Sequence, residues 1–452
     1  MAREGKGLRQ HQMAMPLALL GLGLALVLVG LAIAGPAEAA RGLWAILTAQ
    51  DVLITDYMAI GGPGAALVNA GLVGLITAGL LWLCAEPFNG MALVSAGLMI
   101  GFSLFGKNFV NIWPILLGSW LYAGLKREPF SKYVHVGLLA TSLAPAVSFM
   151  AMGGDRPRLW LGALTGVAIG FLIPPLAAYT FRIQNGMNLY NAGFACGLLG
   201  MLLVPVLKAF GLEPASAHFW ATGYNVPIGG ALSAVCVLLI LSGWWKGGRD
   251  GLSAYRHLLS TSGRAPSDYL RVYGIWPVLV SMGVNGLLAT GYIMLIGGDL
   301  NGPTLGGILT IMGFSAYGKH ARNIVPVMAG VFLGSLFNHV PGTAAALQLA
   351  GLFGTTLAPF AGHFGWPYGV LAGFIHASVV LHAGLPLEGM NLYNNGFSGG
   401  LIAIVLYPVL TSLVRHRRPV LQEEDYFAAM EEDGPLEEDE LDTRRSDDPP
   451  PS

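Results

Sequence analysis

The sequence predicts an all-α polytopic membrane protein with about 14 membrane segments and two inverted structural repeats. Two features of composition lead to this fold class: only 11% of residues are charged and 54% are hydrophobic. Soluble domains carry about 25% charged residues, so this chain has too little polar surface to coat a globule in water. The third observation is a set of sequence blocks that recur in the same order in both halves of the chain.

Hydropathy places the membrane segments in two sets, and both contain a short pair. The first set is 14–35, 64–85, 90–105, 109–125, 134–152, 159–181, 187–207 and 226–245. The second set is 272–297, 303–317, 323–338, 343–360, 366–383 and 390–414. A full span needs about 20 residues. The pairs 90–105/109–125 and 303–317/323–338 fall short of this length, so they are either tilted spans or re-entrant hairpins.

The basic residues give a consistent orientation. Counting crossings from a cytoplasmic N-terminus puts every major basic cluster on the cytoplasmic side, as the positive-inside rule requires: Arg3/Lys6/Arg9, Lys126/Arg127/Lys132, the loop 246–271 and Arg415/Arg417/Arg418. Ala37-Glu38-Ala39 resembles a cleavage site, but the preceding apolar run is long, so we expect an uncleaved first helix. From Glu423 onward the chain holds 13 acidic residues and two arginines. This tail is expected to be disordered, either as a solubilising tail or as a docking segment.

The internal repeat is the most informative pattern. Gly101–Lys107 (Gly-Phe-Ser-Leu-Phe-Gly-Lys) matches Gly313–Lys319 (Gly-Phe-Ser-Ala-Tyr-Gly-Lys), 212 residues further on, and Gly186–Asn191 (Gly-Met-Asn-Leu-Tyr-Asn) is identical to Gly389–Asn394. Further matching blocks are Phe88–Gly90 with Leu300–Gly302, Asn111–Pro114 with Asn323–Pro326, and Thr141–Pro145 with Thr355–Pro359. Six segments per unit plus one linking helix displace the copies by an odd number of crossings, so the copies are predicted to be inverted.

The expected organisation has five parts, listed in chain order: 1–59, an N-terminal helix and external loop; 60–210, the first repeat; 211–271, a linking helix and basic loop; 272–414, the second repeat; and 415–452, the acidic tail. Inverted repeats are typical of secondary transporters and some solute channels, because two copies of opposite orientation can exchange conformations.

Repeated polar residues are the candidate site, since polar groups in lipid are costly unless they are paired or functional. Lys107 and Lys319 are expected at hairpin tips, where they either bind an anionic group or anchor the chain at an interface. The asparagines either bind a polar solute or serve as caps and interhelical bonds; they are Asn111, Asn323, Asn188, Asn191, Asn391 and Asn394.

The hydroxyl and acidic residues are candidates for ion coupling. Thr141/Ser142 and Thr355/Thr356 precede prolines, and their hydroxyls either coordinate Na⁺ or bond their own helix backbone. Glu388, together with Glu86 and Asp299, could carry a coupling proton or simply face water. His376 lies deeper in its segment and reads as an interhelical hydrogen-bonding residue, with a proton relay as the alternative.

The Phe-Gly-Lys-Asn-Phe-Val-Asn-Ile-Trp-Pro and Gly-Met-Asn-Leu-Tyr-Asn blocks resemble those of a prokaryotic integral-membrane family known only as a domain of unknown function. The resemblance covers about residues 45–415 and implies a bacterial or archaeal cytoplasmic membrane, without a substrate. A weaker similarity is to urea transporters, which carry related Asn-Pro and Asn-Gly segments; here the comparable stretches are Glu86–Gly90 and Leu189–Gly193.

The sequence thus favours a secondary transporter for a small polar, anionic solute, with Na⁺ or H⁺ as the candidate coupling ion. A passive channel for a neutral solute and a non-transport scaffold or intramembrane enzyme are the alternatives. No Walker or His-Glu-x-x-His motif occurs, and Cys84, Cys196 and Cys236 lack metal-ligand spacing, so neither an enzyme nor a cofactor is expected. The expected partners are the bilayer and a small solute, with no nucleic acid; a homo-oligomer stays open.

Overall fold

The computed structural model describes residues 2–87, 89–153, 156–214, 217–337, 339 and 344–414. Within these ranges the chain forms helices and no strands. Ten segments are long and apolar enough to cross a membrane, and three further apolar helices are shorter. The expected all-α polytopic fold is therefore confirmed. The acidic tail, with Arg415, Arg417 and Arg418, lies outside the described residues.

Each of the expected segments coincides with helix. The first half of the chain forms α1 (Ala2–Ala34), α2 (Pro36–Thr48), α3 (Tyr57–Leu83), α4 (Gly90–Phe102), α5 (Trp113–Lys126), α6 (Val134–Ala140), α7 (Ala144–Met152), α8 (Leu159–Gln184) and α9 (Asn191–Ala209). The second half forms α10 (Asn225–Leu258), α11 (Tyr269–Tyr273), α12 (Ile275–Leu295), α13 (Gly302–Phe314), α14 (Ala321–Leu336), α15 (Ala344–Phe353), α16 (Ala358–Phe364), α17 (Trp366–Ala383) and α18 (Asn394–Leu413).

The two halves have the same architecture. Helix α1 packs along α3 as α10 packs along α12, and α5 packs on α8 as α14 packs on α17. Two glycines with positive φ recur in the same places: Gly62 kinks α3, and Gly274 separates α11 from α12. The equivalence therefore reaches beyond the aligned blocks to the peripheral helices α1 and α10.

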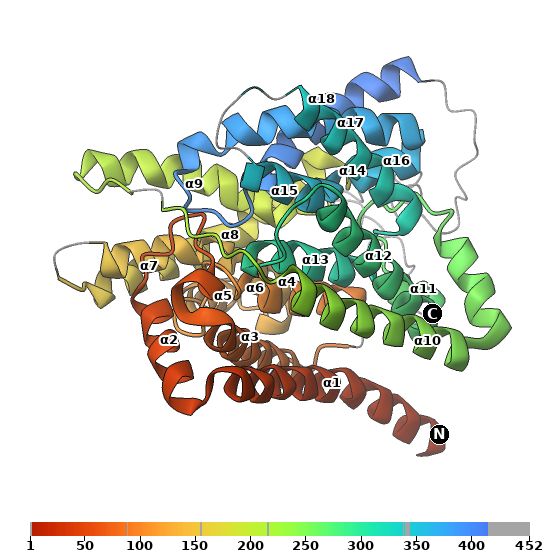
Figure 1. The fold of residues 1–452 in the computed structure, drawn as a ribbon, viewed down its shortest axis with the longest axis horizontal. Coiled ribbons are helices and arrows are strands. Elements are labelled where there is room, and N and C mark those ends of the chain that lie inside the picture. The colour runs from red at the N-terminus through yellow and green to blue at the C-terminus, as the bar shows by residue number, and fades with distance from the viewer. Residues whose placement is uncertain are drawn as a thin grey trace, which may run out of the picture.

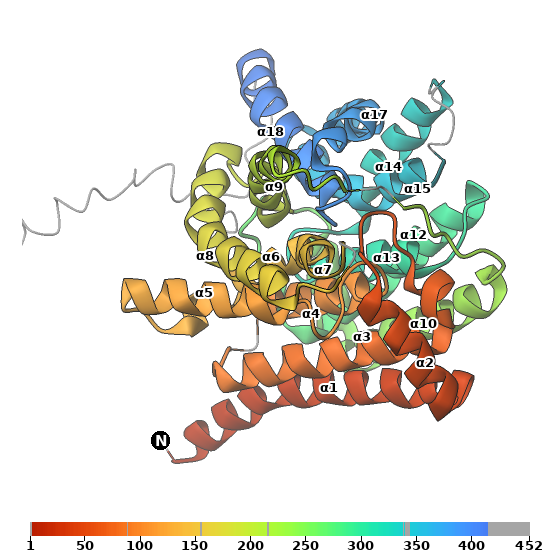
Figure 2. The same ribbon diagram turned by 90° about the vertical axis from the view of Figure 1, so that its left-hand side faces the viewer.

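The short helices α4 and α13 lie side by side at the centre of the molecule (Figures 1 and 2). They are antiparallel, because Gly90 at the start of α4 approaches Ala316 beyond the end of α13, while Gly302 at the start of α13 approaches Leu104 beyond the end of α4. Two equivalent helices that run antiparallel are related by a two-fold axis across their length. The repeats are therefore inverted.

Close contact between α4 and α13 depends on glycine. A Cβ added at Gly97 would lie 2.7 Å from the Leu309 carbonyl oxygen, and one at Gly101 would lie 2.9 Å from the Gly306 carbonyl oxygen. Both distances are shorter than a carbon–oxygen contact allows, so each position needs a residue without a side chain. The two backbones consequently approach closely along the whole pair.

The tips that follow α4 and α13 lie at opposite ends of this pair rather than together. Each helix has 13 residues, a length of roughly 20 Å at 1.5 Å per residue. In a hydrocarbon core about 30 Å thick, tips placed about 10 Å from the midplane would still lie within the core. The tip segments 103–108 and 315–320 are buried, Tyr317 only partly, as re-entrant backbone in a membrane protein must be.

Candidate functional site

The backbone of each tip is held by an asparagine on the preceding long helix. Asn69 on α3 donates to the Ser103 and Lys107 carbonyl oxygens at 2.6 and 2.9 Å and accepts from the Phe109 amide at 3.2 Å. On α12 a different position does this: Asn285, one turn beyond Ser281, which aligns with Asn69, donates to Ser315 Oγ at 2.8 Å and to the Lys319 carbonyl oxygen at 3.4 Å. These bonds satisfy backbone groups that the broken helices leave open.

The two lysines are buried, with exposed fractions of 1% for Lys107 and 0% for Lys319. The Lys319 ammonium donates to Thr355 Oγ1 at 2.7 Å and to the Tyr190 hydroxyl. Lys107 Nζ lies 3.3 Å from Met99 Sδ and 5.3 Å from the centre of the Phe102 ring. Among the described residues, neither lysine has a carboxylate within ion-pair distance, and neither is an interfacial anchor.

Asn111 and Asn323 act as braces of the tips. Their side-chain amides donate to the Gly106 and Gly318 carbonyl oxygens at 3.3 and 2.8 Å. Their oxygens accept from the amide of the residue three positions earlier, at 2.9 Å in both cases. Asn111 also lies 3.3 Å from a carboxylate oxygen of the buried Asp51, which was not among the predicted site residues. The geometry is that of a cap, with all these groups committed to protein partners.

The hydroxyl pairs lie where the middle helix of each half is broken by a short 3₁₀ turn, at Thr141–Leu143 and Gly354–Leu357. Thr141 and Thr355 each donate to the carbonyl oxygen three residues earlier, at 2.5 Å. Thr356 donates to Asn188 Oδ1, whereas Ser142 Oγ has no partner among the described residues. The 3₁₀ turns thus face the repeated Gly-Met-Asn-Leu-Tyr-Asn blocks.

Those blocks cross from one repeat to the other. The Leu189 amide donates to the Thr356 carbonyl oxygen at 3.1 Å, and the Leu392 amide donates to that of Ser142 at 2.9 Å. Two asparagine side-chain amides donate to carbonyl oxygens of the other repeat. Asn188 donates to Gly396 at 3.1 Å, and Asn391 donates to Gly193 at 3.4 Å. Each block therefore docks on the 3₁₀ turn of the opposite half.

The outer asparagines of the blocks lie apart from this centre. Asn191 donates to the Ala177 carbonyl oxygen on α8 at 2.8 Å, and Asn394 is likewise half-buried. Glu388 forms an ion pair with Lys208 in a partly exposed position. His376 is buried and lies 3.0 Å from Asn395 Oδ1, which is the interhelical bond expected of it.

An aromatic cluster lies between the two lysines. The Tyr190 and Tyr393 rings, one from each repeated block, have centroids 5.1 Å apart. Tyr393 also packs on Phe102 at 4.6 Å, and Tyr190 packs on Phe314 at 4.9 Å. Lys319 Nζ lies 4.3 Å from the Tyr190 ring centre. The centre of the molecule is thus a run of rings with a buried cation at each end.

Two aspartates cap the central helices from the opposite repeats. Asp268, which precedes α11, accepts from the Gly90 amide at the start of α4. Asp56, which precedes α3, lies against Gly302 at the start of α13 and accepts from the Ala221 amide at 2.9 Å. Carboxylates are favourable at helix N-termini because of the exposed amides and the helix dipole. The sequence analysis missed both, although an Asp-Tyr pair recurs at the constant spacing of 212.

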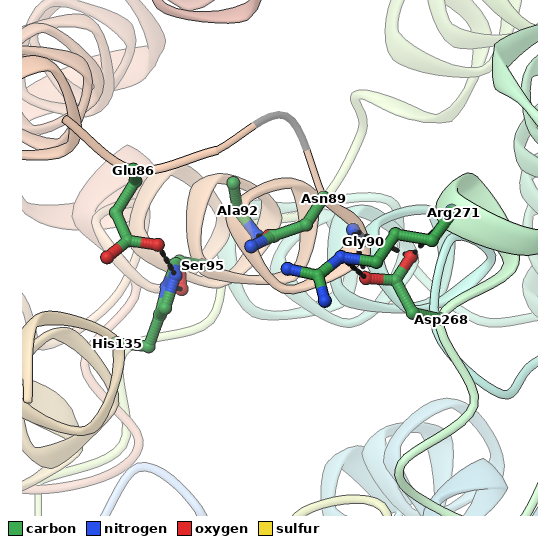
Figure 3. Close-up of polar contacts among 8 residues, drawn as sticks. All are labelled: Glu86, Asn89, Gly90, Ala92, Ser95, His135, Asp268 and Arg271. Atoms are coloured by element: carbon green, nitrogen blue, oxygen red, sulfur yellow. Dashed lines mark hydrogen bonds and ion pairs between the residues drawn. The ribbon is translucent and has the colours of Figure 1, made fainter. Parts of the chain in front are cut away.

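A second polar cluster lies beside the start of α4 (Figure 3). His135 on α6 bridges Ser95 on α4 and Glu86, with Nδ1 2.8 Å from Ser95 Oγ and Nε2 3.1 Å from Glu86 Oε2. In the second half the corresponding region holds Gln348, whose side chain accepts from the Asp299 amide at 3.2 Å. The Ser95–His135–Glu86 chain is therefore a feature of one repeat alone, and it contains one of the expected coupling candidates.

The apolar helices and the inverted halves define an integral membrane protein with a polar, aromatic centre at the junction of its repeats. The chain belongs to the family described as "Protein of unknown function (DUF1576)", whose model matches residues 35–209 and 249–412. The expected membership of an internally duplicated membrane family of unknown function is thus confirmed. No curated protein and no solved structure matches the chain. The comparisons do not show the similarity to urea transporters.

Proposed function

We propose that this protein is a secondary transporter that carries a small anionic solute across the cytoplasmic membrane of a bacterium or archaeon. The observation that carries the proposal is the pair of buried lysines, Lys107 and Lys319, which have no carboxylate partner among the described residues. An uncompensated buried ammonium costs several kcal/mol. Such a cost at both symmetry-related positions is accounted for if a solute anion supplies the missing charge.

The inverted repeats supply a route for alternating access. The starts of α4 and α13 lie at opposite ends of the central pair, and each is capped by the other repeat through Asp268 and Asp56. Release of one aspartate contact opens one end of the α4–α13 pair. Because the repeats are related by a two-fold axis, release of the other contact opens the opposite end by the same kind of motion. With the basic clusters on the cytoplasmic side, the Gly90 end faces the cytoplasm, as do both chain termini.

Coupling to protons fits the protein better than coupling to Na⁺. The Thr141 and Thr355 hydroxyls already bond their own helix backbone, as serine and threonine do in membrane helices. The Ser95–His135–Glu86 chain, in contrast, connects a partly exposed carboxylate to the central helix α4 through a histidine. Histidine exchanges protons near neutral pH.

Uptake into proteoliposomes tests the proposal. The full chain is reconstituted, and uptake of radiolabelled acetate, chloride and phosphate is measured with and without an imposed proton or sodium gradient. We expect saturable, gradient-dependent uptake of at least one anion, and at least a tenfold loss in Lys107→Ala and Lys319→Ala. Lys126→Ala, at an exposed helix end, is the matched control and should keep wild-type uptake.

Two results would contradict the proposal. Full uptake in both Lys107→Ala and Lys319→Ala would show that the lysines do not bind the transported anion. Flux of neutral solutes that ignores every gradient would instead indicate a passive channel. Because the buried lysines also touch structural groups, each variant is first checked for a single, symmetric elution peak by size-exclusion chromatography.

A further inference from the structure

The two symmetry-related lysine sites are not in the same state. In the second half, Lys319 is hydrogen-bonded to Tyr190 and Thr355. The equivalent partners of Lys107 are Tyr393 and Thr141, which are the same residue types. Lys107 bonds neither; its hydrogen-bond acceptor among the described residues is the thioether sulfur of Met99, at 3.3 Å, and sulfur is a weak acceptor.

Two hydroxyls near Lys107 are also without partners. The Tyr393 hydroxyl and Ser142 Oγ are buried and have no hydrogen bond among the described residues. Their counterparts in the other half are both bonded: the Tyr190 hydroxyl accepts from Lys319, and the Thr356 hydroxyl donates to Asn188 Oδ1. Buried hydroxyls are nearly always hydrogen-bonded in proteins. The unfilled donors are therefore confined to one of the two equivalent places.

Lys107, Tyr393 and Ser142 share neighbours. The Phe102 ring lies against Lys107 and Tyr393, with its centre 5.3 Å from Lys107 Nζ and 4.6 Å from the Tyr393 ring centre. The Cys196 thiol, buried on α9, lies close to both Ser142 and Lys107. The Leu392 amide, next to Tyr393, is bonded to the Ser142 carbonyl oxygen at 2.9 Å.

The chemistry of the three groups specifies their ligand. One ammonium and two hydroxyls offer donors and a single positive charge, so the complementary ligand carries one negative charge and two acceptor oxygens. That description is a carboxylate. The buried Phe102 and Met99 side chains around it provide an apolar surface for a short hydrocarbon substituent.

We propose that Lys107, Tyr393 and Ser142 form the binding site for a small monocarboxylate, and that their counterparts Lys319, Tyr190 and Thr356 form the equivalent site in a closed state, in which each is hydrogen-bonded within the protein. The inference deepens the proposed transport function by naming the class of solute. The binding site itself does not rest on transport, because it can be measured at equilibrium without any flux.

Protection of Cys196 tests the site directly. In the full chain carrying Cys84→Ser and Cys236→Ala, reconstituted in nanodiscs, Cys196 is alkylated with N-ethylmaleimide in sodium acetate, propionate, chloride or phosphate at equal ionic strength. Acetate and propionate should slow alkylation saturably, whereas chloride and phosphate should not. Acetate binding is also followed by isothermal titration calorimetry, which does not depend on thiol reactivity.

Two matched substitutions assign the site. Tyr393→Phe removes one donor with almost no change in shape and should weaken acetate binding about tenfold, the effect of losing one hydrogen bond to a charged group. Tyr122→Phe, at a buried tyrosine on α5 outside both sites, is the control and should alter the acetate Kd by less than about twofold. Lys107→Arg keeps the charge and should retain measurable binding, whereas Lys107→Met should abolish it.

The outcomes separate the site from the transport proposal. Equal protection by all four anions, or an acetate Kd that Tyr393→Phe leaves unchanged, overturns the assigned site. Acetate binding that follows the predicted pattern, together with no uptake in proteoliposomes, supports the site and overturns the carrier. Anion uptake that is unaffected by Tyr393→Phe, with no acetate binding, overturns the site and leaves the carrier standing.

Discussion

Both carboxylate oxygens of Asp268 lie 3.0 Å from the Gly90 amide nitrogen, although 178 residues separate the two positions. The bond joins the loop before α11 in one repeat to the start of α4 in the other. Asp56 makes the reciprocal contact with Gly302. The central helices begin on their own caps, Asn89 and Asn301, and each gains a further carboxylate contact from the opposite repeat, so the start of each helix also joins the two halves.

The reciprocal caps predict a specific loss of stability. Asp268→Ala should lower the free energy of unfolding by about 1 kcal/mol or more, because the Gly90 and Arg271 amides both lose their acceptor. Thermal unfolding in detergent measures the change. Asp268→Asn keeps an acceptor oxygen and should lose less. An alanine variant as stable as wild type would show that the cap contributes little.

The asparagines that hold the tips should be more sensitive still. Asn69→Ala leaves the Ser103 and Lys107 carbonyl oxygens buried and unpaired, and each such group costs about 1–3 kcal/mol. Asn285→Ala loses weaker bonds, one of them at 3.4 Å, and should cost less. Comparing the unfolding midpoints of the two variants checks the order. The reverse order would contradict the roles given to these bonds.

The crossing of α4 and α13 should not accept a side chain at Gly97. Gly97→Val should destabilise the protein by about 1–3 kcal/mol or prevent its folding, because the new Cβ meets the Leu309 carbonyl oxygen. Yield and elution profile after extraction report the outcome. Gly79→Ala, on α3 where an added Cβ meets nothing within 4 Å, is the control. Normal behaviour of Gly97→Val would mean that the central pair is loosely packed.

The Ser95–His135–Glu86 chain should affect energy coupling more than solute binding. His135→Asn removes the group that joins Glu86 to Ser95, so acetate uptake driven by a proton gradient should fall at least tenfold. Equilibrium binding of acetate should change by less than about twofold. Proton-driven uptake at the wild-type rate in this variant would exclude His135 from the coupling path.

Much of the fold could be predicted because its signals are local. Apolar stretches mark the helices, and the recurrence of Gly101–Lys107 as Gly313–Lys319 marks the duplication. The depth of the two lysines could not be predicted. A pair of short apolar segments has the same hydropathy whether its tip reaches water or stays within the protein. The packing of α4 on α13, which the sequence does not reveal, decides between these two arrangements.

The partners of the site residues were hidden for a similar reason. Asp56 and Asp268 lie in short loops outside the apolar blocks, so hydropathy gives them no weight, and their bonds cross between repeats. The recurring Asp-Tyr pairs, Asp56-Tyr57 and Asp268-Tyr269, were the available signal. The unequal bonding of Lys107 and Lys319 has no counterpart in the sequence at all, because the residue types around them are nearly the same.

The reciprocal caps also constrain how the protein can be made. A ribosome completes α9 before it has translated Asp268. Helix α4 therefore enters the membrane before the carboxylate that accepts from its first amide, at Gly90, has been made. The first half therefore waits, with the Gly90 amide not yet bonded to Asp268 and the Gly186–Asn191 block undocked, until the second half is inserted in the opposite orientation. The bonds between the halves are consequently the last to form as the chain is made, because each of them needs residues of the second half.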